Sequence, residues 1–158
     1  NPAYLTAAKY ISNRIDITFQ NLREHKEAAF VAYICAGDPS YSASLEIARS
    51  LADAGADIIE LGVPFSDPQA DGVVNQLAAE RALNAGMSVH KLMDFIREFR
   101  TTHDTAIVLF TYLNPVYAYG YEQFHAGHKQ ECQIFSAILQ QYEPPDQHRR
   151  KILWVRQG

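Results

Sequence analysis

Short apolar runs alternate with longer amphipathic stretches along most of this chain. The runs are nearly continuous, as in strands buried on both faces of a sheet, and occupy residues 30–36, 57–63 and 106–112. Apolar residues at helical spacing occur around residues 13–26, 43–54, 73–84 and 89–99, with another helix beginning near 121. Because apolar strands alternate with amphipathic helices, the pattern predicts an α/β fold with a parallel sheet.

The ends of the predicted elements carry turn and capping residues. Ser40 or Ser42 can cap the helix over 43–54, and Ser88 can cap the helix that begins after it. The three predicted strands each run into a polar segment containing Gly or Pro: residues 37–39, 64–72 and 114–115. Because parallel strands end at one edge of their sheet, we expect these segments to lie together, where functional residues collect.

One charged residue, Glu60, interrupts the second apolar run between Ile59 and Leu61. Such apolar neighbours disfavour an ionised carboxylate, whereas Asp71 in a polar loop stays ionised more readily. Two carboxylates in contrasting environments can divide the roles of acid and base. Alternatively, Glu60 points away from a site and pairs with an arginine, and Asp67 and Asp71 are turn formers.

Three segments together resemble the tryptophan synthase alpha subunit family. The most specific is AGADIIELGVPFSDPQADG at residues 54–72, and FVAYICAGDP at 30–39 and YLNP at 112–115 flank it in the family's order and spacing. The resemblance covers about residues 14–125. It implies a (βα)8 TIM barrel, of which this sequence contains about the first three to four βα units.

The family cleaves indole-3-glycerol phosphate to indole and glyceraldehyde 3-phosphate in tryptophan biosynthesis, a carbon–carbon lyase reaction that uses no cofactor. The resemblance implies that Glu60 is the acid/base that protonates the indole ring carbon and helps deprotonate the glycerol hydroxyl. It implies that Asp71 takes up or stabilises the indole N–H proton. Both roles agree with the local sequence, because this cleavage needs a proton delivered to an unreactive aromatic carbon.

Further residues follow from the same resemblance. Tyr33, Phe110 and Tyr112 match positions that line the indole pocket, although the family often has phenylalanine in place of Tyr33. Asp67 and Asn114 match positions facing a tryptophan synthase beta subunit in an alpha2-beta2 type complex. The resemblance implies that pyridoxal phosphate belongs to that beta subunit and that this chain needs no cofactor or metal.

Residues 126–158 depart from the family's pattern and form the second part of the predicted division, after residues 1–125. Residues 134–142 allow an amphipathic helix, and 152–155 allow a short strand. A frameshifted or truncated gene is one hypothesis for this change, and the other reading frames of the coding DNA test it. The phosphate-binding loops that TIM barrels commonly carry after strands 7 and 8 are expected to be missing.

Two further functions therefore stand beside the lyase. One is a catalytically inactive half-barrel that binds a beta-type partner or associates with itself, since an open sheet has an unpaired edge. The other is a related barrel enzyme of indole or phosphosugar metabolism.

Composition and charge narrow the partners of the chain. A net charge of −4 over 158 residues predicts neither nucleic-acid nor anionic-lipid binding, and no apolar run approaches the ~20 residues that span a bilayer. With two cysteines far apart, a disulfide framework is not expected, and we predict a cytoplasmic location. His125, His128 and Cys132 can share a helix face, but without a fourth ligand we expect no metal.

Overall fold

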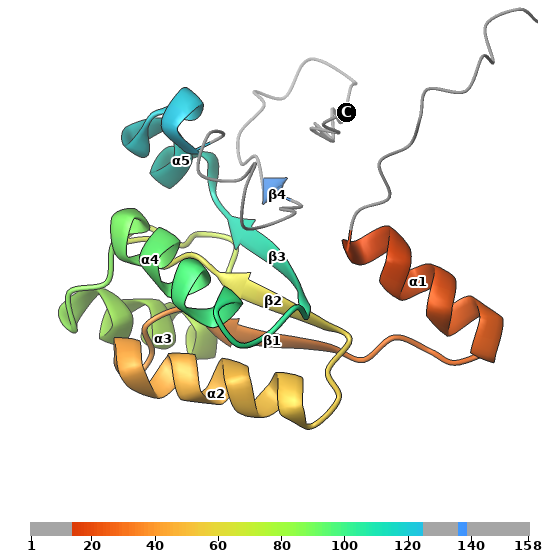
Figure 1. Ribbon diagram of the computed structural model, residues 1–158. Coiled ribbons are helices and arrows are strands. Elements are labelled where there is room, and N and C mark those ends of the chain that lie inside the picture. Colours follow the sequence, from red (N-terminus) through yellow and green to blue (C-terminus); the bar gives the residue numbers. More distant parts are fainter. Residues whose placement is uncertain (1–13, 125–135, 139–158) are drawn as a thin grey trace, which may run out of the picture.

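The computed structural model describes residues 14–124 and 136–138, which contain a four-stranded parallel sheet (Figure 1). Its strands lie in chain order and are β1 (Val31–Cys35), β2 (Ile58–Gly62), β3 (Ala106–Thr111) and β4 (Ser136–Ile138). Glu60 is the register partner of Tyr33 on β1 and of Val108 on β3. All strand pairs are parallel, so the predicted loops do follow the same edge of the sheet.

Helices connect the strands much as the apolar spacing predicts. They are α1 (Arg14–His25), α2 (Tyr41–Asp53), α3 (Val73–Asn84), α4 (Val89–Arg100) and α5 (Leu113–Tyr119). Two serines act as the predicted N-caps: Ser40 Oγ accepts a hydrogen bond from the Ala43 N–H, and Ser88 Oγ accepts one from the Lys91 N–H, both at 3.3 Å.

The main core lies between the sheet and helices α2, α3 and α4. Side chains from every second strand position enter it, including Ile59 and Leu61 of β2, which are 1% and 0% exposed. The helices contribute large side chains such as Leu92, Phe95 and Phe99, all fully buried. Because successive strand side chains alternate between faces, Glu60 must lie on the opposite face of the sheet.

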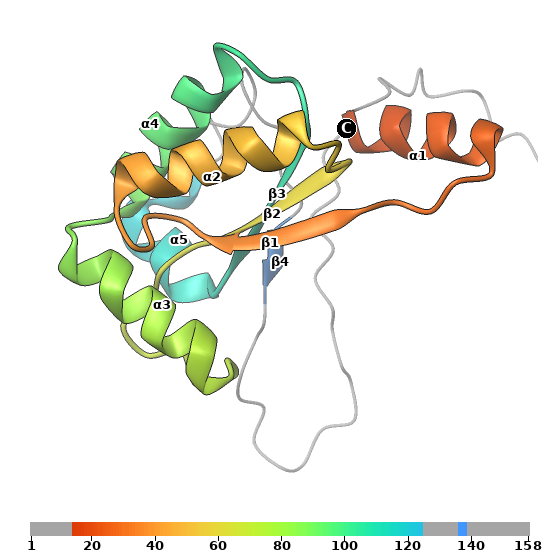
Figure 2. The ribbon, with the colours of Figure 1, turned by 90° about the horizontal axis from the view of Figure 1, so that it is seen from below.

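Within residues 14–124 and 136–138, that opposite face, called here the inner face, is covered only in part. At the amino ends of the strands, Ile15 of α1 packs with Ile58 and Ala106 in a small second cluster, against which Val108 also lies. Figure 1 shows α1 at the end of the sheet away from α5, and Figure 2 shows the same separation from below. The carboxyl ends of the strands therefore lie away from α1.

Two predicted segments take a different structure from the one expected. Leu113-Asn114-Pro115, predicted as a turn, begins α5; proline is tolerated there because the first helical N–H groups have no partner within the helix. Residues 136–138, predicted within a helix, form β4 instead and pair with β3 from Leu109 to Thr111. The short apolar run fits either state, and pairing with the free edge of β3 supplies strand hydrogen bonds.

Parts of other predictions lie outside the described residues. Residues 121–124 are helical, whereas the expected continuation to residue 128 and the strand over 152–155 lie outside the described residues. The division of the chain at 125/126 stays a prediction. Within the described residues, no helix is both long enough and apolar enough to cross a membrane.

Candidate functional site

Glu60 lies at the centre of the inner face of the sheet. It is partly exposed, and its register partner on β1 is Tyr33, which is 39% exposed on the same face. None of the ion pairs found within the described residues involves Glu60. The structure therefore gives no support to the alternative in which Glu60 is the partner of an arginine.

Aromatic rings border Glu60 toward the carboxyl ends of the strands. The rings of Tyr33 and Phe110 meet edge to face, with centroids 6.3 Å apart. The Tyr33 ring also lies across Gly62 of β2: a Cβ atom at Gly62 would be 2.4 Å from the Tyr33 hydroxyl. Only glycine leaves room for this ring position, so the two strands together build one wall of the site.

Asp71 reaches the same edge from the loop between β2 and α3. Its Oδ2 atom accepts a hydrogen bond from the hydroxyl of Tyr112 at 3.1 Å, and this hydroxyl accepts one from the Ala70 N–H at 2.9 Å. Tyr112 follows β3 directly, and its ring lies against Phe65 with centroids 5.3 Å apart. The loop that carries Asp71 is thus connected to the carboxyl end of a different strand.

The pKa of Tyr33 depends on its burial and on the charges near it. Partial burial is the main cause that raises the pKa of Tyr33 above its ordinary value, followed by the neighbouring Cys35 thiol. The negative charges of Asp71 and Glu60 then raise the pKa of Tyr33 further. Tyr33 therefore stays a protonated hydroxyl at neutral pH.

Burial likewise affects the other ionisable groups at this edge. It raises the pKa of the Cys35 thiol to about 11, helped by the charge of Asp38. It also raises the pKa of Tyr112, and the hydrogen bond to Asp71 adds to this whereas the bond from Ala70 opposes it. At neutral pH, Cys35 and Tyr112 are therefore both uncharged.

Asp38 joins the loop after β1 to helix α3. Its carboxylate accepts two hydrogen bonds from the guanidinium of Arg81 on α3, at 2.7 and 2.8 Å. Asp38 precedes Pro39 through a cis peptide bond. Its role in the structure is therefore to hold the loop after β1 against α3.

The two residues expected to face a partner are exposed. Asp67 lies in the loop after β2, where its carboxylate accepts hydrogen bonds from the side chain of Gln69 at 3.1 and 3.3 Å. Asn114 lies in the first turn of α5. Both therefore follow the carboxyl ends of strands, and their role as contacts stays a prediction.

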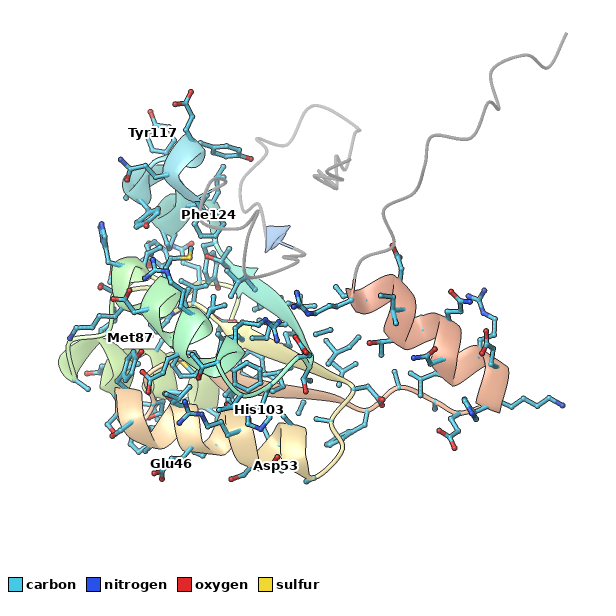
Figure 3. All side chains as sticks on the ribbon, viewed as in Figure 1. Glu46, Asp53, Met87, His103, Tyr117 and Phe124 are labelled. Carbon is cyan, nitrogen blue, oxygen red and sulfur yellow. The ribbon has the colours of Figure 1, made fainter. Side chains whose placement is uncertain are left out.

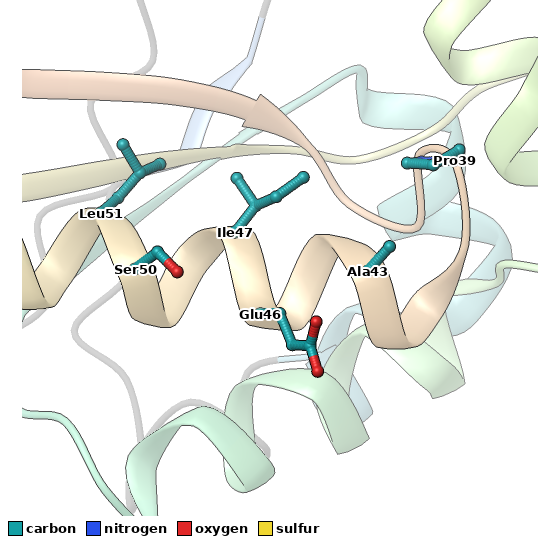
Figure 4. A pocket seen from close by; sticks show the side chains of 6 residues that line it. All are labelled: Pro39, Ala43, Glu46, Ile47, Ser50 and Leu51. Atoms are coloured by element: carbon teal, nitrogen blue, oxygen red, sulfur yellow. The ribbon is translucent and has the colours of Figure 1, made fainter.

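A separate hollow lies away from these residues. It is an open groove of about 480 Å³ along α2, lined by Pro39, Ala43, Glu46, Ile47, Ser50 and Leu51 (Figure 4). Glu46 is its one ionisable residue, so it lacks paired groups for catalysis. Within the described residues, no three His, Cys, Asp or Glu side chains are arranged to hold a metal, and His125, His128 and Cys132 lie outside them.

Four contributors to the site carry no signal in the apolar pattern. Gln76 on α3 donates to the backbone carbonyl of Asp71 at 2.8 Å, and Phe65 supports the ring of Tyr112. Gly62 makes room for Tyr33, and the Ala70 N–H binds Tyr112. Glycine within a strand is a general sign of close packing, whereas the other three contacts depend on the path of the loop.

Comparison with known proteins agrees with this geometry. The family model described as "Tryptophan synthase alpha chain" matches residues 19–150. The chain belongs to the tryptophan synthase alpha chain family. It is 44% identical over 143 residues to the tryptophan synthase alpha chain of Methylibium petroleiphilum, and 46% identical over 112 residues to that of Opitutus terrae. The family match continues past residue 125, where the resemblance recognised in the sequence ends.

Solved structures of the tryptophan synthase alpha family show the same fold. The alpha subunit of Legionella pneumophila is 40% identical, with a TM-score of 0.71 over 73% of this chain and 44% of its own. Tryptophan synthase from M. tuberculosis in an aminoacrylate-bound form is 31% identical, with a TM-score of 0.69 over 78% and 51%. The architecture is therefore a TIM barrel present in part, as predicted from the sequence.

The match covers most of this chain but only part of its relatives. It includes 81% of this chain and 53% of the Methylibium relative, and 71% and 42% for the Opitutus relative. The chain thus spans about half the length of the curated relatives it matches.

Proposed function

We propose that this chain carries the acid/base centre of a tryptophan synthase alpha-type lyase, which cleaves indole-3-glycerol phosphate to indole and glyceraldehyde 3-phosphate. The observation that carries the proposal is where the sheet places the two carboxylates. Glu60 is the register partner of Tyr33 on the inner face, and Asp71 accepts a hydrogen bond from Tyr112 at the carboxyl end of β3. They come from a strand and from a loop, 11 positions apart, and face a partly open aromatic surface.

In the proposed reaction, Glu60 delivers a proton to the indole ring carbon and helps remove the proton of the glycerol hydroxyl. Asp71 stabilises the positive charge that develops at the indole N–H. The two carboxylates have different surroundings, which supports this division. Asp71 accepts a hydrogen bond from the Tyr112 hydroxyl, whereas Glu60 lies partly exposed on the inner face, opposite to its buried chain neighbours Ile59 and Leu61. The step requires no cofactor.

The aromatic surface suits the flat apolar part of the substrate. Tyr33 and Phe110 meet at a right angle on the inner face, which leaves a ring face and a ring edge for an indole to contact. Tyr112 lies further along the same edge, beside Phe65. Tyr33 is the register partner of Glu60, and Tyr112 is hydrogen-bonded to Asp71, so a ligand lying on these rings would contact the neighbours of both carboxylates. This supports the same edge as the reaction site.

We further propose that the partner is a tryptophan synthase beta chain that carries pyridoxal phosphate. Asp67 and Asn114 support this, since both are exposed beside the proposed site. A product released at this edge would then leave next to the partner. Titration of the chain with a beta chain tests this, and Asp67→Ala with Asn114→Ala should weaken the binding.

Indole release from indole-3-glycerol phosphate, measured with a beta chain present, tests the lyase function. Glu60→Gln should lower kcat by about 10²–10⁴-fold, the usual contribution of a positioned acid/base. Glu46→Gln is the matched control. Glu46 is exposed in the groove along α2, so this substitution should leave kcat unchanged (Figure 4).

The same experiment separates the alternatives. Equal indole release by the wild type and Glu60→Gln would refute the role of Glu60. No release by the wild type, with binding to the beta chain retained, would favour the catalytically inactive half-barrel. Binding of ribulose-type phosphates in place of indole-3-glycerol phosphate would favour another barrel enzyme.

A further inference from the structure

Tyr112 makes two hydrogen bonds through one hydroxyl to two consecutive loop residues. The hydroxyl donates its hydrogen to Asp71 Oδ2 at 3.1 Å and accepts the Ala70 N–H at 2.9 Å. It thereby uses its single hydrogen and one lone pair. One contact orients the carboxylate of Asp71, and the other fixes the backbone immediately before it.

The ring of Tyr112 is itself held firmly. Tyr112 is 9% exposed and connects the last residue of β3 to the first residue of α5. Phe65 packs on its ring at an angle of 39°. The hydroxyl is therefore placed by the end of β3 and by the packing of the ring on Phe65, which belongs to the same loop as Asp71. Tyr112 thus joins this loop to the sheet through its ring and through its hydroxyl.

A second side chain supports the loop from α3. Gln76 Nε2 donates to the carbonyl of Asp71 at 2.8 Å and lies 3.4 Å from the carbonyl of Pro68. Together, Tyr112 and Gln76 hold the side chain and the backbone of Asp71. Among the described residues, the other carboxylate oxygen of Asp71, Oδ1, accepts no hydrogen bond, which leaves it for a ligand.

We propose that Tyr112 is a positioning residue that fixes the rotamer of Asp71 toward the substrate, in addition to any contact it makes as part of the pocket wall. The proposal rests on the lyase function proposed above. A carboxylate held in place before the substrate arrives loses less entropy during the reaction, which raises kcat more than it changes KM. A residue that only lines the pocket would instead change KM.

The test variant is Tyr112→Phe, which keeps the ring against Phe65 and removes both hydrogen bonds. The matched control is Tyr117→Phe on α5, the same chemical change at a side chain that is 79% exposed (Figure 3). Amide hydrogen exchange at Ala70, followed by NMR on the labelled chain, directly measures the hydrogen bond from the Ala70 N–H to the Tyr112 hydroxyl. Exchange should rise about tenfold in Tyr112→Phe, the effect of one lost hydrogen bond, and stay unchanged in the control.

Steady-state indole release with a beta chain present provides the second measurement. Tyr112→Phe should lower kcat by about 10–100-fold and change KM by less than about threefold, because the catalytic group is misplaced but the apolar surface is kept. A higher KM with an unchanged kcat would overturn the proposal and leave Tyr112 as a wall of the pocket.

The two measurements fail independently of each other. If the wild-type chain releases no indole, the lyase function fails, and amide exchange alone then tests whether Tyr112 holds the loop that carries Asp71. In that case, faster exchange at Ala70 in Tyr112→Phe still supports the positioning role of Tyr112. Unchanged exchange at Ala70 overturns this positioning role, whatever the activity.

Discussion

Replacing Gly62 with alanine should force the ring of Tyr33 away from β2. A Cβ atom at residue 62 would lie 2.4 Å from the Tyr33 hydroxyl oxygen, 2.9 Å from Cζ and 3.0 Å from Cε2. Gly62 is not among the residues with a positive φ, so its backbone accepts alanine without strain. The whole effect of the substitution should therefore come from this one contact.

The structure sets the size of the effect. The hydroxyl must retreat by about 1 Å before the contact reaches the ordinary range, and overpacking of this kind costs ~1–3 kcal/mol in a closed core. Tyr33 is 39% exposed and can rotate toward solvent, so we expect the lower end, ~1 kcal/mol off the free energy of unfolding. The moved ring also loses its edge-to-face contact with Phe110.

A double-mutant cycle measures this contact. The free energy of unfolding is determined by urea denaturation for the wild type, Gly62→Ala, Tyr33→Ala and the double variant. In the Tyr33→Ala background, Gly62→Ala should cost nothing or stabilise by ~0.5 kcal/mol, because glycine has the more flexible unfolded state. Gly72→Ala, at a glycine with no atom within 4 Å of the added Cβ, should show the same effect in both backgrounds.

The reasoning would be refuted if Gly62→Ala destabilised the chain equally with and without the Tyr33 side chain. The cost would then lie in the strand backbone. Under the proposed function, Gly62→Ala should also raise the KM for indole-3-glycerol phosphate, because it disturbs the aromatic surface and leaves Glu60 and Asp71 intact.

Three other predictions concern the fold around the site. Ser44→Ala should cost ~1–3 kcal/mol in urea denaturation, because Ser44 is 1% exposed and accepts the Gly37 N–H at 2.9 Å; an unchanged midpoint would contradict this. Burial raises the pKa of Cys35 from 9.0 to about 11, so the folded chain holds this proton more tightly than the unfolded one. The free energy of unfolding should therefore fall as the pH rises from about 9 to about 11, and Cys35→Ala should make that fall shallower; an equal slope would refute the assignment. Leu92→Ala, at a fully buried side chain, should cost ~2–5 kcal/mol, whereas Ile47→Ala at a side chain that is 42% exposed should cost well under half of that; thermal or urea unfolding compares them.

The helices and strands that are defined by local spacing were predictable. The helix over 73–84 has the predicted bounds, and Ser88 caps α4 as expected. By contrast, α5 was missed, because Pro115 looks like a stop signal and only its place in the first turn makes it compatible with a helix. The strand at 136–138 depends on the free edge of β3, which no local pattern can reveal.

The residues of the candidate site were also largely predictable, because Glu60 is an isolated charge in an apolar strand and the segment around it is specific to a family. The contacts that hold these residues in place were not predictable. The contact of Tyr112 with Ala70 and Asp71 joins residues more than 40 positions apart. The bond from Gln76 to the Asp71 carbonyl depends on how the loop turns back over α3.

By itself, the sequence determined β1 to β3 with helices α1 to α4, the family, and the pair of carboxylates, because apolar periodicity and a specific motif are local properties. Only the tertiary structure decided that Glu60 lies on the inner face with Tyr33, and that Asp71 is held by Tyr112. The alternation of strand side chains limits Glu60 to two faces, but the packing of α2, α3 and α4 on one of them decides which face remains for the site.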